Sequence, residues 1–250
     1  MKLTMKPAIA ALVATTLLTS TAAIAGPGSV TSAGVTQGKL ELKNDLIAAF
    51  DYEDDANEEY EAKLEVEYGV TDKLQLKLEG EGKHTAGADT EFEKVKLAAK
   101  HELTKQGDYF FDSAAQLSYS IGTTSGKADE IEGELILAKN IGAYEFKSNF
   151  ELAEEVGDHS EESALFELKL GGYTKLDSGV TVGLEYYGDF GELGDMQSYD
   201  EQKHFIGPRA KWGYDIAEGT ELKFELGYYA GISEAAEDAT LLLRTKFEFE

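Results

Sequence analysis

Charged side chains alternate with apolar ones along most of this chain, and their carboxylate and ammonium groups have the most evident chemical capacity. In "YEAKLEVEYGV", Leu64 and Val66 lie on one parity, whereas Glu61, Lys63 and Glu65 lie on the other. Carboxylates at every second residue can pair with lysines on a neighbouring strand or attract cations to a surface. The pattern therefore predicts a charged face that handles polar solutes or stabilises a polar interior.

Two groups of charged residues share this polar parity. A basic arc comes from the first predicted strand and the last three, and it comprises Lys39, Lys43, Arg209, Lys211, Lys223, Arg244 and Lys246. An acidic wall comprises Glu61, Glu65, Glu79, Glu81, Glu130, Glu132 and Glu134. Facing walls of opposite charge favour a path for a polar solute. Cross-strand Glu–Lys pairs that only stabilise a polar lumen explain the same pattern.

Catalytic and metal-binding motifs are not evident. The four histidines are His84, His101, His159 and His204. No two of them are close enough in sequence to form a metal-ligand pair, so we predict no metal site and no cofactor. A lipid-modifying enzyme of the outer membrane requires a nucleophile beside a base. Ser160 next to His159 is the one adjacent pair, and it lies in an acidic loop, so we predict that the chain is not an enzyme.

The elements that carry these residues have a period close to two, which indicates strands and not helices. Twelve strands are predicted near 39–52, 60–70, 74–83, 91–103, 109–121, 130–141, 144–152, 164–176, 180–190, 203–216, 221–230 and 240–249. Each has about the length of a tilted strand that crosses a bilayer, roughly 9 to 11 residues. The predicted fold is all-β: a single antiparallel up-and-down transmembrane β-barrel of about 12 strands.

The connections between the strands alternate in length. Short turns such as "TDK" and "DSG" follow the even-numbered strands, whereas longer acidic loops such as "EDDANEE" and "EVGDHSEES" follow the odd-numbered ones. This alternation and an even strand count are typical of bacterial outer-membrane barrels with both termini in the periplasm. A secreted β-sandwich or a lipocalin-like barrel is the soluble alternative, since either one also alternates apolar and polar residues.

Composition and the N-terminus define the domains. The formal charge of −25 excludes a nucleic-acid partner, and the chain has no cysteine. Two lysines, an apolar run and Ala23-Ile24-Ala25 predict a secretory signal peptide over residues 1–25. A flexible periplasmic lead is predicted over 26–38, followed by the barrel over 39–250. The chain is therefore expected to be exported to the outer membrane.

The chain ends on "LLLRTKFEFE", a strand with Phe247 and Phe249 on its apolar parity. In a barrel the last strand pairs with the first, so the chain is expected to be ordered to its end. The phenylalanines would then lie in the periplasmic aromatic girdle. This ending resembles the C-terminal assembly signal of outer-membrane proteins, although Glu250 follows the aromatic residue. The resemblance implies the barrel assembly machinery as a partner.

A second resemblance is carried by "YGVTDKLQLKLEG" near the N-terminus and by "GLEYYGDFG", "QKHFIGP", "ELKFELGYYAGIS" and "LLLRTKFEF" over the last third. These stretches resemble the MetA-type family of outer-membrane proteins named for the meta-pathway of phenol degradation. Membership would imply an outer-membrane barrel with a role in the uptake of small molecules and no catalytic residues.

The function expected from the sequence is a narrow channel or transporter for small solutes. Clustered acids in the longer loops, among them Asp54, Asp55, Glu161 and Glu162, predict weak cation selectivity and contact with the lipopolysaccharide layer. Twelve strands fall between small filled barrels and wide porins, so a narrow pore and a plugged lumen are both open. A plugged structural or surface barrel is the first alternative, and a lipid-modifying enzyme is the second.

Overall fold

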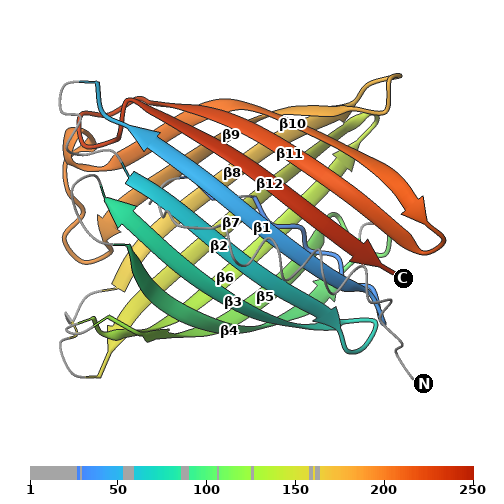
Figure 1. Cartoon of the computed structure of the whole chain (residues 1–250), viewed down its shortest axis with the longest axis horizontal. Helices are drawn as coiled ribbons and strands as arrows, with labels where there is room; N and C mark the ends of the chain where they lie inside the picture. Colours follow the sequence, from blue (N-terminus) through green and yellow to red (C-terminus); the bar gives the residue numbers. More distant parts are fainter. Residues whose placement is uncertain are drawn as a thin grey trace.

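The computed structural model describes residues 27–28, 30–52, 59–85, 90–105, 107–124, 127–157, 160 and 164–250. Within these ranges, twelve antiparallel strands form one closed barrel (Figure 1). The strands are β1 (Leu40–Phe50), β2 (Glu59–Gly69), β3 (Leu74–Thr85), β4 (Glu91–Thr104), β5 (Asp112–Gly122), β6 (Asp129–Ile141), β7 (Tyr144–Val156), β8 (Ala164–Lys175), β9 (Thr181–Glu192), β10 (Lys203–Ala217), β11 (Thr220–Gly231) and β12 (Ala239–Phe249). The predicted fold class and strand count are confirmed.

The two ends of the barrel differ. Short turns join β2 to β3, β4 to β5, β6 to β7, β8 to β9 and β10 to β11, and the start of β1 and the end of β12 lie at the same end. We call this end the turn rim and the opposite end the loop rim. The loop rim carries a short 3-10 helix, η2 (Tyr199–Glu201). No helix in the described ranges is long and apolar enough to span a membrane.

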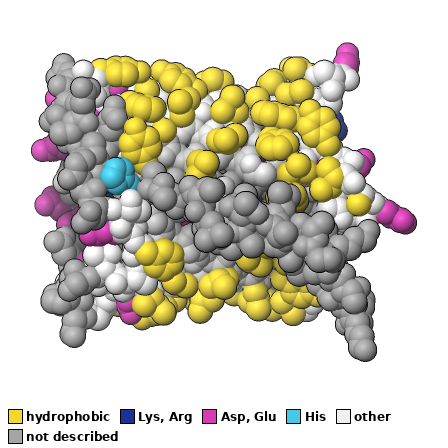
Figure 2. Space-filling view, viewed as in Figure 1, with side chains coloured by type: hydrophobic (Ala, Val, Ile, Leu, Met, Phe, Trp, Pro, Cys, Tyr) yellow, Lys and Arg dark blue, Asp and Glu magenta, His cyan; other side chains and the backbone are white. Residues whose placement is uncertain are grey.

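Alternation along each strand gives the barrel an apolar outer face and a charged inner face. Leucines of neighbouring strands point outward, with Leu76 48%, Leu97 54% and Leu117 63% exposed. In Figure 2, hydrophobic side chains cover much of the described outer surface between the two ends of the barrel, whereas acidic side chains gather toward those ends. Because charged residues occupy the other parity, the lumen holds the ion pairs described below.

The last strand closes the barrel to the end of the chain. Phe247 lies opposite Leu42 of β1 and Leu222 of β11, and Phe249 lies opposite Leu40 and Thr220. The backbone N–H of Glu250 still donates to the carbonyl of Gly219 at 3.0 Å. The expectation that the chain is ordered to its end is therefore correct, and its cause is the pairing of β12 on both edges.

Residues 27–28 and 30–38, predicted as part of a flexible lead, run inside the barrel and are packed against its wall. We call residues 27–36 the lumen segment; its residue 29 lies outside the described ranges. Val30, Ala33 and Val35 are buried. Gly38, with a φ of +82°, turns the chain from this segment toward β1, and its N–H donates to the Gly69 carbonyl at 2.8 Å. The departure from expectation arises because Val30 and Ala33 pack against apolar side chains of the wall and because wall side chains bind the main chain of the segment.

Candidate functional site: two cavities in the barrel lumen

The described part of the lumen is hollowed by two adjoining cavities, one near each rim. The turn-side cavity has a volume of about 510 Å³, and the loop-side cavity has a volume of about 440 Å³. Thr31 of the lumen segment lines both, so this segment lies at their boundary. Each volume falls within the range of cavities that hold small ligands, about 300 to 1,000 Å³.

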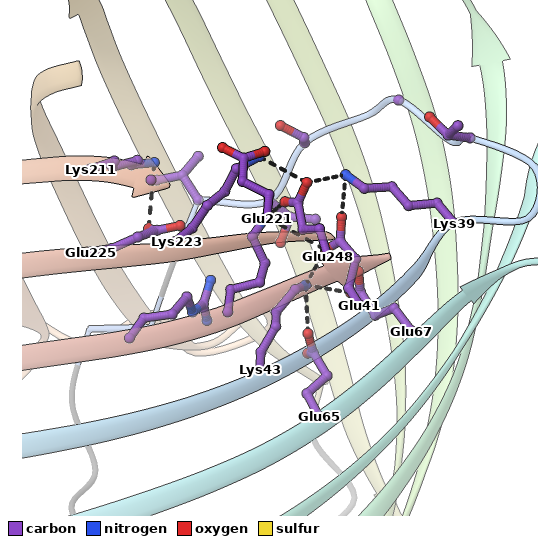
Figure 3. A pocket seen from close by; sticks show the side chains of 18 of the residues that line it. Lys39, Glu41, Lys43, Glu65, Glu67, Lys211, Glu221, Lys223, Glu225 and Glu248 are labelled. Atoms are coloured by element: carbon purple, nitrogen blue, oxygen red, sulfur yellow. Dashed lines mark hydrogen bonds and ion pairs between the residues drawn. The ribbon is translucent and has the colours of Figure 1, made fainter. Parts of the chain in front are cut away.

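The turn-side cavity collects most of the predicted basic arc. Six members of that arc line it: Lys39, Lys43, Lys211, Lys223, Arg244 and Lys246. The close-up in Figure 3 shows several of these side chains converging with glutamates from neighbouring strands. Among the described residues, ten lysines or arginines and six glutamates line the cavity. Its described lining therefore has a positive formal charge.

Many of these charges form ion pairs across strands. Lys43 of β1 lies 2.6 Å from Glu65 and 2.8 Å from Glu67 of β2. The Glu248 carboxylate of β12 lies 2.7 Å from Lys39 and 2.8 Å from Lys223. These pairs support the view that Glu–Lys contacts stabilise the lumen.

Lys175 and Lys211 account for part of the positive excess. Within the described ranges, no carboxylate lies at ion-pair distance from Lys175. The nearest carboxylates to Lys211 are Glu185 and Glu225, each at 3.8 Å, and its ammonium lies 4.0 Å from the centroid of the Tyr173 ring. These ammonium groups are therefore less closely paired with carboxylates than those of Lys39 and Lys43.

Arg209 is the one member of the basic arc that does not line this cavity. It is 1% exposed on the inner face of the barrel, where its guanidinium lies 2.6 Å from Glu225 of β11. It also donates to the Tyr229 hydroxyl at 2.9 Å and lies 3.6 Å from Glu185. Arg209 is thus placed to neutralise buried carboxylates, which is a structural role.

Glu185 of β9 is the centre of this buried polar cluster. The hydroxyls of Tyr173, Tyr187 and Tyr229 all lie within hydrogen-bond distance of its carboxylate, the last at 2.5 Å. Glu185 itself is 1% exposed. A buried carboxylate with several donors and a nearby guanidinium is satisfied, so the cluster fixes the geometry of β8 to β11.

The sequence reasoning did not find this cluster. Its members come from β8, β9, β10 and β11, and only the register of those strands places them together. The one sequence signal is that Tyr173, Glu185, Tyr187, Arg209 and Tyr229 all fall on the inward parity of their strands.

The loop-side cavity contains the whole predicted acidic wall. All seven members line it: Glu61, Glu65, Glu79, Glu81, Glu130, Glu132 and Glu134. Twelve aspartates or glutamates face eight lysines or arginines around this cavity. Its described lining therefore has a negative formal charge, opposite to that of the turn-side cavity.

Pairing is again extensive but incomplete in the loop-side cavity. Lys96 of β4 lies 2.6 Å from Glu132 of β6. Glu134 has no lysine or arginine at ion-pair distance within the described ranges and accepts a hydrogen bond from Gln116 at 3.1 Å. Glu130 and Lys94 are 3.9 Å apart. Some carboxylates of this cavity therefore keep much of their negative charge. Among the described residues, Glu134 is bonded only to a neutral amide, and the nearest ammonium group to Glu130 is 3.9 Å away.

Side chains of the barrel wall hold the lumen segment mainly by hydrogen bonds to the main chain of the segment. The Asn149 side chain of β7 accepts the N–H of Thr31 at 2.9 Å, and its amide nitrogen lies 3.5 Å from the Thr31 carbonyl. Lys100 donates to the Ser32 carbonyl at 3.0 Å. Glu102 accepts the Val35 N–H at 2.9 Å. Sequence gave no signal for these partners, because they contact main-chain groups of a glycine- and serine-rich stretch.

Two apolar contacts complete the attachment. Val30 packs in a buried cluster that includes Ile47, Tyr187 and Leu242. Ala33 packs against Ala114 and Ile136. The Tyr187 hydroxyl lies 2.8 Å from the Gly28 carbonyl and 2.7 Å from Glu185, so its single proton can serve either acceptor. Tyr187 therefore connects the lumen segment with the buried polar cluster around Glu185.

His204 at the loop rim is a buried residue with hydrogen-bond and stacking partners. His204 is 2% exposed, and its ring accepts or donates hydrogen bonds with Tyr186 and Gln202, each at 2.8 Å. The Tyr199 ring stacks on it at 4.7 Å between centroids. These contacts fit a packed structural histidine at the start of β10.

The described residues include only part of the predicted acidic loops. Ser198 donates to Glu201 at 2.8 Å, and this contact holds the pKa of the Glu201 carboxyl below its usual range. Among the described residues, no group of three or more His, Asp or Glu side chains is arranged to hold a metal ion. The signal peptide and several acidic loop residues lie outside the described residues, namely residues 1–25, Asp54, Asp55, His159, Glu161 and Glu162.

Comparisons with known proteins identify the architecture. No family model matches the chain, and no curated protein matches it. Among solved structures, the COG4313 outer membrane channel from Pseudomonas putida F1 aligns with a TM-score of 0.58 at 12% identity, over 90% of this chain and 99% of that chain. The NanC porin aligns with a TM-score of 0.56 at 11% identity, over 84% and 99%. The β domain of the Bordetella autotransporter BrkA aligns with a TM-score of 0.50 at 11% identity, over 86% and 100%. The chain therefore shares the single-barrel fold of outer-membrane channels, porins and autotransporter domains.

Proposed function

We propose that the chain is a narrow channel of the bacterial outer membrane that admits small polar solutes. The observation that carries this proposal is the closed barrel whose charged lumen holds two adjoining cavities of about 510 and 440 Å³. A lumen filled only by ion pairs has no need of such space. The names of two similar folds, a channel and a porin, agree with this function.

The outer face supports placement in a membrane. Water-exposed leucines on successive strands, such as Leu97 and Leu117, would be costly in a soluble protein. A closed barrel satisfies its backbone without edges, which a bilayer requires. We place the turn rim in the periplasm and the loop rim at the lipopolysaccharide layer, with the signal peptide over residues 1–25 removed on export.

Two resemblances add detail to the proposal. Membership of the MetA-type family would give the channel a role in the uptake of small molecules. Phe247 and Phe249 would serve as the assembly signal that the barrel assembly machinery reads. Both phenylalanines occupy the last paired positions of β12, where such a signal would be available before the barrel closes.

Weak cation selectivity is the expected electrostatic property. A solute entering from the loop rim meets acidic loops and then the loop-side cavity, where acids outnumber bases by twelve to eight. Charged linings attract counter-ions over about a Debye length, roughly 8 Å at physiological salt. The basic excess of the turn-side cavity opposes this effect, so the net preference should be small.

Liposome swelling with purified protein tests solute passage. Vesicles that contain the folded protein should swell in isotonic glycine or arabinose faster than vesicles that contain the heat-unfolded protein. Swelling should decline steeply between monosaccharides and trisaccharides, since the cavities are small. Equal swelling rates for folded and unfolded protein would refute the channel.

A plugged structural barrel is the second candidate, and the lumen segment is the observation that favours it. Val30, Ala33 and Val35 are buried inside the barrel, and Thr31 lies at the boundary of the two cavities. If the segment seals the lumen, the wild type should not support swelling, and deletion of residues 30–36 should restore it. Failure of both proteins to support swelling would favour a barrel without transport.

A further inference from the structure

The contacts of the lumen segment have the character of a ligand in a binding site. Between residues 30 and 36 the segment forms no helix, turn or strand. It has no partner strand that would satisfy its backbone, so side chains of the barrel supply the hydrogen bonds instead. Buried backbone groups require such partners.

The wall groups are suited to any peptide backbone. Asn149 meets both main-chain groups of Thr31, because one amide side chain carries an acceptor and donors. Lys100 binds a carbonyl, and Glu102 binds an N–H. None of these contacts uses a side chain of the segment, so the wall reads its main chain.

The apolar contacts of the segment indicate which side chains a bound peptide would need. Ala33 is 1% exposed against Ala114 and Ile136, which leaves room for a small residue only. Val30 enters a larger apolar cluster. A ligand would therefore combine a peptide backbone with small apolar side chains at two positions spaced by three residues.

The opposite formal charges of the two cavities favour one orientation of a bound peptide. Pro27 and Gly28 line the acidic loop-side cavity, whereas Gly34 and Thr36 line the basic turn-side cavity. A free peptide bound in the same direction would place its α-ammonium group at the acidic loop-side cavity and its α-carboxylate at the basic turn-side cavity. The resident segment carries no free carboxylate at that end.

We infer that the inner face of the barrel, where the two cavities meet, is a binding site for short zwitterionic peptides. The chain's own lumen segment occupies this site and competes with free peptide. This inference rests on the proposed function, since it names a solute class for the same lumen. The tether gives the segment an effective concentration of about millimolar. Free peptide should therefore bind well only when the segment is absent or displaced.

Calorimetric titration in detergent tests this site without any need for transport. The protein is the variant that lacks residues 30–36, and the probe is the decapeptide PGSVTSAGVT, the sequence of residues 27–36. Binding should be at least about tenfold weaker to the wild type, where the segment competes. The reversed sequence, and the same peptide acetylated and amidated at its ends, should each bind at least about tenfold weaker.

Wall variants in the deletion background locate the site. Asn149→Ala should reduce peptide affinity about tenfold or more, because it removes two backbone contacts. Ser118→Ala is the control: it removes a buried inward hydroxyl that lines neither cavity, and it should leave affinity within about twofold. If the deletion variant fails to fold, full-length Gly69→Ala replaces it, since a Cβ there would meet the Thr36 carbonyl oxygen at 1.9 Å and so disturb the segment.

The outcomes separate the two proposals. Folded protein with an empty lumen that binds neither peptide, or binds forward and reversed peptides equally, would overturn the peptide site and leave the channel untouched. Peptide binding that requires Asn149, in a protein that gives no liposome swelling, would support the site and refute the channel.

Discussion

The side chain of Asn149 faces both main-chain groups of Thr31, which is 118 residues away in sequence, with its Oδ1 2.9 Å from the Thr31 nitrogen and its Nδ2 3.5 Å from the Thr31 oxygen. This contact attaches the lumen segment to β7 near the boundary of the two cavities. It therefore gives the Asn149 side chain control over part of the attachment, beside Lys100 and Glu102.

Thiol labelling can measure this control, because the natural chain has no cysteine. Ala33→Cys should react slowly with a membrane-impermeant maleimide in an otherwise wild-type barrel, since Ala33 is 1% exposed. Adding Asn149→Ala should speed labelling about 5- to 30-fold, as expected for the loss of roughly 1 to 2 kcal/mol. Ser118→Ala should leave the labelling rate unchanged. Fast labelling without any wall substitution would contradict a packed segment.

The buried cluster around Glu185 should govern stability. Arg209→Met leaves the Glu225 and Glu185 carboxylates buried without their guanidinium, which typically costs about 3 to 5 kcal/mol. The temperature at which the barrel loses its heat-modifiable gel mobility should fall clearly. Lys73→Met, in an exposed turn, is the control and should not shift that temperature. An unchanged value for Arg209→Met would show that the cluster does not support the wall.

The end of the chain should be essential for closure. Deleting residues 247–250 removes the β12 partners of Leu40 and Leu42 of β1, and it removes the Glu248 carboxylate that binds Lys39 and Lys223. Unsatisfied backbone groups in a bilayer cost several kcal/mol each, so the truncated protein should be degraded in the periplasm. Deleting Glu250 alone should be mild, since it removes one hydrogen bond to Gly219. Normal heat-modifiable barrels from the four-residue deletion would refute this account of closure.

Selectivity should respond to the two cavities in opposite directions. Replacing Glu130 and Glu134 with Gln should weaken cation preference, whereas replacing Lys175 and Lys211 with Gln should strengthen it. The measurement is the reversal potential in a salt gradient of about tenfold, and each effect should diminish as salt rises. Lys73→Gln lines neither cavity and serves as the control. A shift of the same sign in both double variants would contradict the divided lumen.

The sequence predicted the barrel well because its signal is local. Alternation alone assigns Leu241 and Leu243 to the outer face and Lys246 and Glu248 to the inner face, as the structure has them. The same parity identified the residues around both cavities. Parity says nothing about burial, so it could not separate Arg209, which is buried among inward side chains, from Lys211, which lines the cavity.

The lumen segment was beyond sequence reasoning for a different reason. A short stretch rich in glycine and serine has the composition of a flexible linker. Its attachment depends on Asn149 and Glu102, which are far away in sequence and bind main-chain atoms. Gly38 and Gly69 were the available clues, because one turns the chain inward and the other lacks a Cβ where the Thr36 carbonyl passes.

Single-channel recording in planar bilayers tests the central claim most directly, namely that the lumen is a solute path narrowed by residues of its own chain. Wild-type protein should give a small conductance. The variant that lacks residues 30–36 should give a larger one, and so should Gly69→Ala, which places a Cβ 1.9 Å from the Thr36 oxygen. Gly133→Ala, where a Cβ meets nothing within 4 Å, should match the wild type. Identical conductance in all four proteins would contradict the claim, as would an absence of current from the folded deletion variant.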